Sequence, residues 1–329
     1  MIRALKGVFS LAIGALALAA CSGSGTETAG IDRGGVTTPV SVVGPITGFG
    51  SIIVNGVHYS VDKASVIVDG NPATASDLEL GQVVTVVGER DASGSTGIAN
   101  RVLFQTNVRG PISALNTAAS EITVLDHTVI ASSSTIFDLA GVPGSFGSLR
   151  VGDLVSVSGF VSSHGSIEAT RIQNVMASSG LLAFGVVSNL DRALLHFNLG
   201  ALVVDYSQAT LIEGFASGGP SNGDRVLVRA TSTAPSGALL AREVRRAEDE
   251  EAEAGQEAEV EGLITRFASA TDFDVGGRPV TTTSATTYRG GGSSALALNV
   301  KVEVEGAVNA SGVIVATRVE IEGGPDGDD

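Results

Sequence analysis

One serine in the sequence stands in a motif that could serve nucleophilic catalysis. Residues 219–223 read GPSNG, which has the Gly-x-Ser-x-Gly spacing of a hydrolase nucleophile elbow around Ser221. Such an elbow needs a strand before the serine and a helix after it, so that the hydroxyl is exposed above an oxyanion hole. Here a run with strand-type alternation follows, and we interpret Ser221 as a loop residue. A hydrolase in which Ser221 lies near His196 and an acid is the alternative.

The histidines and acidic residues do not form the pattern of a metal site. A zinc site needs three or four converging ligands, usually with close pairs in the sequence. Residues 272–276, DFDVG, match the start of a calcium loop but lack its later ligands. No lysine follows a glycine-rich turn into a helix, as a phosphate-binding loop requires. We therefore predict no catalytic, metal-binding or cofactor-binding residue. No close pair occurs among the four histidines, His58, His127, His164 and His196.

The single cysteine, Cys21, follows a segment that is typical of a signal peptide. Arg3 and Lys6 supply a positive start, and residues 7–20 are small or apolar without interruption. This run is shorter than the roughly 20 apolar residues that span a membrane, and it fits the core of a signal peptide. The ending LAAC at residues 18–21 resembles the lipobox of bacterial lipoproteins. The resemblance implies that Cys21 is acylated and becomes the new N-terminus, while an ordinary secretory signal is the alternative.

The residues after the cysteine bear on localisation and stability. In Gram-negative lipoproteins an Asp directly after the acylated cysteine resembles an inner-membrane retention signal. In this chain the residue after Cys21 is Ser22. The resemblance therefore implies a lipoprotein of the bacterial envelope, at the outer membrane. Residues 22–39 are rich in Gly, Ser and Thr, and we expect a flexible tether. One cysteine permits no disulfide within the chain, so the folded part depends on apolar burial and backbone pairing.

The rest of the chain is organised by a unit that occurs four times. In residues 149–172 a Gly-Asp pair is followed by alternating valines, a glycine, a Ser/Gly turn and the sequence Ala-Thr-Arg-Ile. Period-two apolar spacing on both sides of a turn is typical of a β-hairpin. Each copy also has a shorter hairpin before this one. In the first copy the shorter hairpin turns at Asn55-Gly56, two residues that tolerate positive φ. The related stretches are residues 80–102, 221–244 and 298–319.

The number of strands in each unit favours a closed sheet. If the sheet stayed open, five or six short strands in about 65 residues would leave unpaired edges, which promote aggregation. The recurring glycines fit the sharp bends that closure requires. We therefore predict an all-β fold of four tandem small β-barrels of the OB-like type. A β-sandwich made of paired copies is the alternative.

The repeated motifs resemble the bacterial family known as domain of unknown function 5666. The shared features are a Gly-x-Ile opening, the Asn-Gly hairpin, a Gly-x-x-Val-x-Val-x-Gly strand and an Ala-x-x-Val ending, over about residues 45–321. The resemblance implies tandem β-repeats in an exported protein or lipoprotein. No catalytic residue is known for the family, so none is transferred to this chain.

The predicted organisation includes one strongly acidic interruption. Residues 247–261 carry eight acidic and no basic residues, and we interpret residues 247–260 as a solvated linker that isolates the fourth unit. The predicted segments are a signal peptide at 1–21, a tether at 22–39, repeat 1 at 40–106, repeat 2 at 107–178, repeat 3 at 179–246, the linker at 247–260, repeat 4 at 261–322 and an acidic tail at 323–329.

Charge and composition restrict the partners. Loss of Arg3 and Lys6 with the signal peptide leaves 18 basic against 35 acidic side chains, and the chain has no tryptophan. Single-stranded nucleic acid is bound by basic grooves and stacking aromatics, so we expect no nucleic-acid partner. An envelope protein or a glycan is the partner class that we keep open, besides the membrane reached through Cys21.

These observations favour a non-enzymatic, lipid-anchored structural or binding module. Loops on a rigid scaffold are the usual place of recognition, so we expect residues 71–79 and 139–148 to carry contacts. One alternative is a hydrolase-type enzyme with a site between repeats. Another is an outer-membrane assembly or adhesion factor that presents an open sheet edge to its partner.

Overall fold

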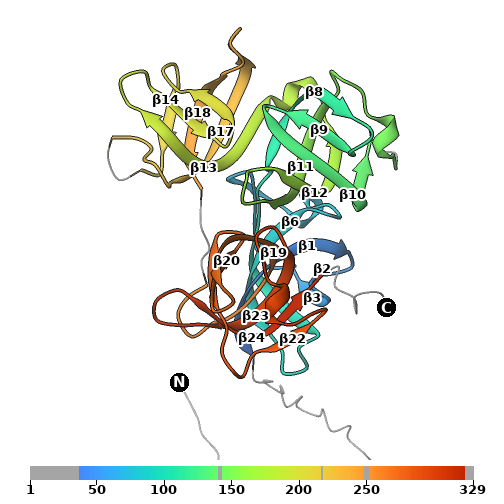
Figure 1. The fold of residues 1–329 in the computed structure, drawn as a ribbon. Coiled ribbons are helices and arrows are strands. Elements are labelled where there is room, and N and C mark those ends of the chain that lie inside the picture. Colours follow the sequence, from blue (N-terminus) through green and yellow to red (C-terminus); the bar gives the residue numbers. More distant parts are fainter. Residues whose placement is uncertain (1–36, 140–142, 216–217, 248–251, 323–329) are drawn as a thin grey trace, which may run out of the picture. The chain divides into compact units, whose positions relative to one another are not determined.

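The chain folds into four groups of β-strands, one for each predicted repeat, in a computed structural model (Figure 1). The structure describes residues 37–139, 143–215, 218–247 and 252–322, and these lie in one compact unit. The fold is all-β, as predicted, with short 3₁₀ turns between strands. The signal peptide, Cys21, the acidic tail and most of the tether lie outside the described residues. In the described part of the chain, no helix has the length and apolarity needed to cross a membrane.

Repeat 1 closes into a ring of five strands. They are β1 (Thr38–Gly48), β2 (Ile52–Val54), β3 (Val57–Ser60), β6 (Val83–Arg90) and β7 (Thr96–Phe104). β1 pairs with β2, β2 with β3, β3 with β7, β7 with β6, and β6 again with β1. Only the β3–β7 pair is parallel. This closed order is that of a small OB-like barrel, as predicted. β4 (Ser65–Val68) and β5 (Asn71–Ala73) extend the sheet beyond β7, and η1 (Ala75–Asp77) follows.

The other three repeats close in the same order, and each of these closed rings contains one parallel pair. Repeat 2 contains β8 (Val108–Asn116), β9 (Glu121–Val124), β10 (His127–Asp138), η2 (Phe146–Ser148), β11 (Leu154–Val161) and β12 (Ile167–Asn174). Repeat 3, after η3 (Ala177–Ser179), contains β13 (Leu181–Asp191), β14 (His196–Leu199), β15 (Leu202–Asp205), β16 (Leu211–Glu213), β17 (Arg225–Thr233) and β18 (Leu239–Arg246). Repeat 4 contains β19 (Glu257–Ser269), β20 (Asp272–Val275), β21 (Arg278–Thr281), β22 (Thr287–Arg289), η4 (Ser293–Ala295), β23 (Lys301–Val308) and β24 (Ile314–Ile321).

Glycine allows the two long strands of the closing hairpin to approach each other at a bulge. Gly88, Gly159 and Gly306 each lie where the register of this hairpin shifts. A Cβ atom at any of them would lie 2.1–2.2 Å from a carbonyl oxygen of the opposite strand. These glycines are therefore required by close backbone packing at a bulge. At the same place in repeat 3, Ala230 has register shifts on both sides.

Alternating apolar residues fill the barrels. The inward positions are mostly Val, Ile and Leu, and one fully buried ring stands in three of the repeats, namely Tyr59, Phe197 and Phe273. The buried residues of repeats 2 and 3 form one continuous cluster, whereas repeats 1 and 4 form two clusters, and the cluster of repeat 4 includes Val43 of repeat 1. With no disulfide available, this burial supplies the main favourable free energy of folding.

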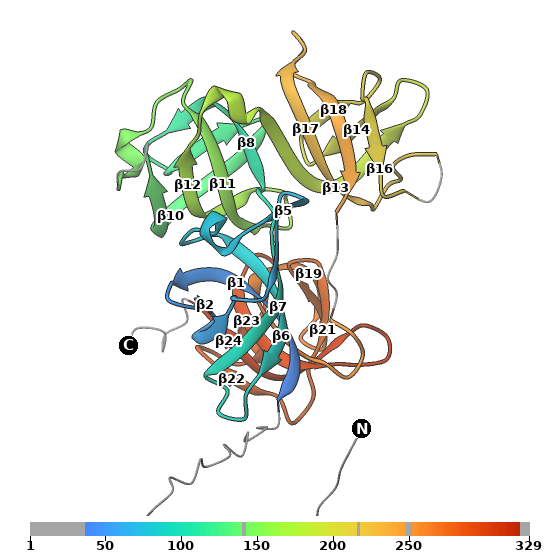
Figure 2. The same ribbon diagram turned by 180° about the vertical axis from the view of Figure 1, so that it is seen from behind.

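Repeats 1 and 4 share one sheet although they are farthest apart in the sequence. The first half of β1 pairs in parallel with the first half of β19, from Val40–Glu257 to Val43–Val260. The two strands lie side by side in both views (Figures 1 and 2). The prediction of a linker at residues 247–260 that isolates the fourth unit is therefore wrong at its C-terminal end. Ala258 and Val260 of this acidic stretch enter the core, and Glu259 is buried against Arg90 of repeat 1.

Repeats 2 and 3 also share a sheet, through antiparallel pairing of β8 with β13. The turn between β4 and β5 of repeat 1 reaches both of them. Asp69 binds Arg109 of repeat 2 at 2.8 Å, and the carbonyls of Asp69 and Gly70 accept hydrogen bonds from Arg229 and Arg245 of repeat 3. Contacts between repeats are thus made by paired strands and by arginines.

Candidate functional site

The residues that could have formed a hydrolase site have separate partners. Ser221 lies in the loop before β17, where its N–H donates to Asp224 at 2.7 Å and its Oγ accepts from Arg192 at 3.3 Å. His196 faces Asp205, with Nε2 and Oδ2 3.5 Å apart. No hydrogen bond joins Ser221 to His196 among the described residues. As predicted from the sequence, a strand and not a helix follows the GPSNG motif.

The remaining histidines and the aspartates of the calcium-like motif are also engaged locally. His58 contacts Ser51 at 3.2 Å, and His164 contacts Ser163 at 3.1 Å. Asp272 and Asp274 both bind Arg266, at 2.7 and 2.6 Å. His127 and His164 are the two histidines that line a common cavity, described below.

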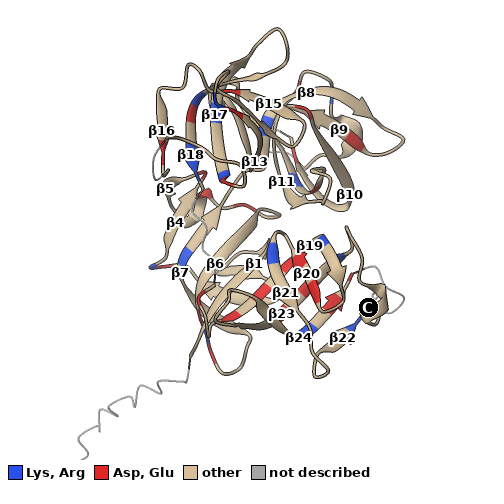
Figure 3. Ribbon diagram, turned by 60° about the vertical axis from the view of Figure 1, so that its left-hand side comes forward, with Lys and Arg blue, Asp and Glu red and all other residues tan. Residues whose placement is uncertain are grey.

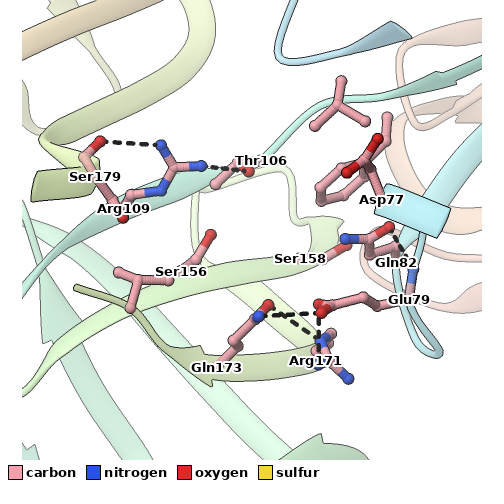
Figure 4. A pocket seen from close by; sticks show the side chains of 13 residues that line it. Asp77, Glu79, Gln82, Thr106, Arg109, Ser156, Ser158, Arg171, Gln173 and Ser179 are labelled. Carbon is pink, nitrogen blue, oxygen red and sulfur yellow. Dashed lines mark hydrogen bonds and ion pairs between the residues drawn. The ribbon is translucent and has the colours of Figure 1, made fainter. Parts of the chain in front are cut away.

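A polar cleft of about 360 Å³ lies between repeats 1 and 2 (Figure 4). Arg171, on β12, binds Glu79 at 2.9 Å and Asp138 at 2.6 Å, and donates to the carbonyl of Leu80 at 3.1 Å. The Gln173 amide also donates to Glu79, at 3.2 Å. The charge of Arg171 is therefore compensated by carboxylates of the same chain.

This cleft contains part of a loop that was predicted to contact an external partner. Asp77 and Glu79 of residues 71–79 line it, and Glu79 contacts repeat 2 of the same chain. On the opposite side Arg109 binds Asp69 and donates to the carbonyl of Ser179 at 3.4 Å. We interpret the cleft as a joint between two repeats, because its ionic groups hold the repeats together. The second predicted loop, residues 139–148, is only partly described.

A larger cavity, of about 750 Å³, lies where all four repeats meet. Its lining is mainly apolar and includes eight glycines, so backbone is exposed to the cavity without side chains in front of it. Most ligand pockets have volumes of about 300–1,000 Å³ and combine an apolar lining with a few polar groups. Its main apolar side chains are Val43, Leu103, Phe160, Val161, Phe184, Val186 and Leu263. Its polar side chains include Gln105, Asn107, His127, Ser162, His164, Ser188, Arg225, Glu261 and Arg278.

His127 is held as a neutral hydrogen-bonding group at this cavity. Its side chain is buried, and Nδ1 lies 2.8 Å from the carbonyl of Leu125, which requires the proton on Nδ1. Burial lowers the pKa of His127 below its ordinary value, although the Leu125 carbonyl acts in the opposite direction. Nε2 is then a hydrogen-bond acceptor. The cavity residue Gly200 lies next to this atom, because a Cβ atom added to the glycine would be 4.0 Å from Nε2. The ring can therefore accept a hydrogen bond from a bound molecule.

Two aromatic rings at the cavity carry cations on their faces. The guanidinium of Arg225 lies 5.2 Å from the ring centre of Phe184, and Nζ of Lys301 lies 5.0 Å from that of Phe160. Lys301 also binds Glu261, at 2.7 Å. These contacts fix the rings in place, since cation–π attraction strengthens where water is excluded. The cavity thus combines rigid apolar surfaces with polar groups from each repeat.

Sequence reasoning did not find this cavity. Phe160 and Phe184 each stand next to a glycine in a strand, which was the only local signal. Their convergence depends on how the repeats pair, through β1 with β19 and β8 with β13. Neither pairing has a signature in the alternation of apolar residues.

Comparison with known families gives one match. The model of the family described as domain of unknown function (DUF5666) matches the chain four times, at residues 40–102, 109–173, 184–245 and 261–320. These four ranges follow the four closed barrels, and the resemblance seen in the sequence is confirmed. No curated protein matches the chain.

Proposed function

The chain belongs to the DUF5666 family, and from this premise we propose that it is a non-enzymatic binding module of the bacterial envelope. In this proposal a lipid on Cys21 anchors it at the outer membrane, and its four barrels together hold a small amphipathic ligand. The observation that carries the binding role is the cavity of about 750 Å³ to which all four repeats contribute. A single barrel would not provide this site.

The composition of the cavity supports a ligand with an apolar body and a polar end. Val186 and Val161 are 51% and 40% exposed, and both line the cavity. Covering such surface is favourable by about 25 cal/mol per Å². His127, Arg225 and the exposed backbone of the glycines supply donors and acceptors for the polar end.

The other two functions have less support from the described residues. A hydrolase would require Ser221 and His196 to meet, and each has another partner. An assembly factor would act through an open sheet edge, whereas the main strands of each repeat close into a ring.

Cavity filling is expected to weaken the binding of an amphipathic probe. The probe is 1-anilinonaphthalene-8-sulfonate, and its dissociation constant is measured by fluorescence on the chain from residue 22. Val186→Trp fills the cavity, and we expect it to weaken the affinity about tenfold, which corresponds to about 1.4 kcal/mol. Val203→Trp is the matched control, because Val203 is also a half-exposed strand valine of repeat 3 and does not line the cavity. Equal affinities of the two variants would contradict the cavity as the binding site.

Lipidation is expected to place the protein in the membrane fraction. Cells expressing the full chain should incorporate labelled palmitate into it, and Cys21→Ser should abolish both the label and the sedimentation with membranes. Ser22→Asp should keep the label and move the protein from the outer to the inner membrane fraction. Membrane association of Cys21→Ser that equals that of the unchanged chain would exclude the anchor.

A further inference from the structure

His127 presents a hydrogen-bond acceptor to the large cavity. The residue is only 8% exposed, and the backbone acceptors next to its ring are the carbonyls of Val124 and Leu125 in its own hairpin. Because the Leu125 carbonyl keeps the proton on Nδ1, Nε2 can only accept a hydrogen bond. Nε2 lies beside Gly200 of repeat 3, which also lines the cavity, and no hydrogen bond engages it among the described residues. A side chain that is more than nine-tenths buried therefore directs an acceptor without a partner at a space large enough for a ligand.

Gln105 is a second polar side chain that lacks a hydrogen-bond partner in the described part of the chain. It lies between β7 and β8 and lines the same cavity, and its Oε1 is buried without a hydrogen bond. Rotation about its terminal torsion, which is broad in glutamine, lets the amide oxygen accept from a bound molecule. Elsewhere on the wall, Oδ1 of Asn107 accepts from the N–H of Gly159 at 2.8 Å. The hydroxyl of Ser188 donates to the carbonyl of Asn198 at 3.3 Å.

The Arg and Glu side chains of the cavity wall already have partners. Glu261 lies on β19, whose acidic residues are visible as red segments in Figure 3, and Lys301 binds it at 2.7 Å. Arg225 lies over the ring of Phe184, and Arg278 also has a partner within the chain. An ionic end of a ligand would have to leave water and compete with these partners, which costs more than the transfer of a neutral polar group. The wall therefore favours an uncharged polar end.

We propose that the cavity binds an uncharged amphipath with a hydroxyl end, as in a long-chain alcohol or a monoacylglycerol. This assignment rests on the binding function proposed above and names its ligand class. The hydroxyl group donates to Nε2 of His127, and Gln105 bonds the same end of the molecule. The alkyl chain covers apolar side chains of the wall such as Phe160, Val161 and Val186. A carboxylate binds less tightly, because it has no hydrogen to donate to Nε2.

The test compares three ligands that share a decyl chain and differ in their polar end. 1-Decanol, decanoate and decylammonium are titrated separately into the chain from residue 22, and calorimetry gives each dissociation constant. The pH is 8, at which decanoate is an anion and decylammonium a cation. We expect decanol to bind about tenfold more tightly than either ion, because only its hydroxyl end is both uncharged and a hydrogen-bond donor.

Two variants remove the polar groups that the ligand is expected to contact. In His127→Asn the new amide can still donate to the Leu125 carbonyl in place of Nδ1, but the acceptor at Nε2 is lost. We expect it to weaken decanol binding about fivefold, which is the contribution of one neutral hydrogen bond, and to change decanoate binding less than about twofold. Gln105→Met should weaken decanol binding by a similar factor. Gln208→Met is its matched control, because Gln208 is exposed and does not line the cavity.

The outcomes separate the ligand class from the binding function. Decanoate binding as tight as that of decanol, or unchanged decanol binding in both His127→Asn and Gln105→Met, would overturn the ligand class. If none of the three decyl ligands binds while 1-anilinonaphthalene-8-sulfonate does, the ligand class is wrong and the cavity keeps its binding role. If the sulfonate does not bind either, the binding function fails as well. Circular dichroism checks the fold of each variant, and Gln105→Met decides the test if His127→Asn does not fold.

Discussion

Gly159→Ala is expected to lower the free energy of unfolding by about 2–3 kcal/mol, the upper part of the range for an overpacked position. The added Cβ atom would lie 2.1 Å from the carbonyl oxygen of Glu168 and 2.8 Å from its carbonyl carbon. Both atoms belong to the backbone of β12, which is hydrogen-bonded on both sides and cannot yield as a side chain would. Urea unfolding followed by far-UV circular dichroism measures the change.

The control for this prediction is Ala230→Gly in repeat 3. Ala230 occupies the place of Gly159, but the register of β17 and β18 shifts on both sides of it, and the side chain is accommodated. Removing its methyl group should cost no more than about 1 kcal/mol. A Gly159→Ala protein as stable as the unchanged chain would show that the recurring glycine is not required for strand approach.

The barrels could be predicted because their determinants are local. Alternating valines fix which face of each strand is buried, and the Asn55-Gly56 turn, with φ of +48° and +75°, fixes the first hairpin. The recurring glycine in the first strand of the closing hairpin marks the bulge in three of the four repeats. Each of these signals lies within a few residues of the feature that it determines.

The association of the repeats could not be predicted in the same way. Parallel pairing of β1 with β19 uses backbone groups that every strand possesses, and so leaves no pattern in the side chains. Composition was misleading at residues 247–260, where acidic residues indicated a solvated linker. Glu259 instead faces Arg90, 169 residues earlier in the chain. The large cavity depends on these pairings, and for this reason no residue of it was identified from the sequence.

Arg90→Met is expected to destabilise the chain by about 3–5 kcal/mol, the cost of removing one partner from a buried ion pair. The side chains of Arg90 and Glu259 are 15% and 3% exposed. Burial raises the pKa of Glu259, and the charge of Arg90 opposes this shift, so loss of the guanidinium leaves a buried carboxylate without compensation. Urea unfolding at pH 8, where the carboxylate of Glu259 is exposed to mildly alkaline solvent conditions on unfolding, measures the loss.

Two comparisons separate the ion pair from a general effect of charge. Arg289→Met removes a guanidinium that is 67% exposed and lies 4.0 Å from Glu320, and it should change the stability by less than about 1 kcal/mol. Replacing both Arg90 and Glu259 with methionine should recover most of the loss, because an apolar pair of similar volume needs no compensating charge. If the double variant is as unstable as Arg90→Met, the defect lies in packing. In that case the junction of β1 with β19 depends on the shape of these side chains and not on their charges.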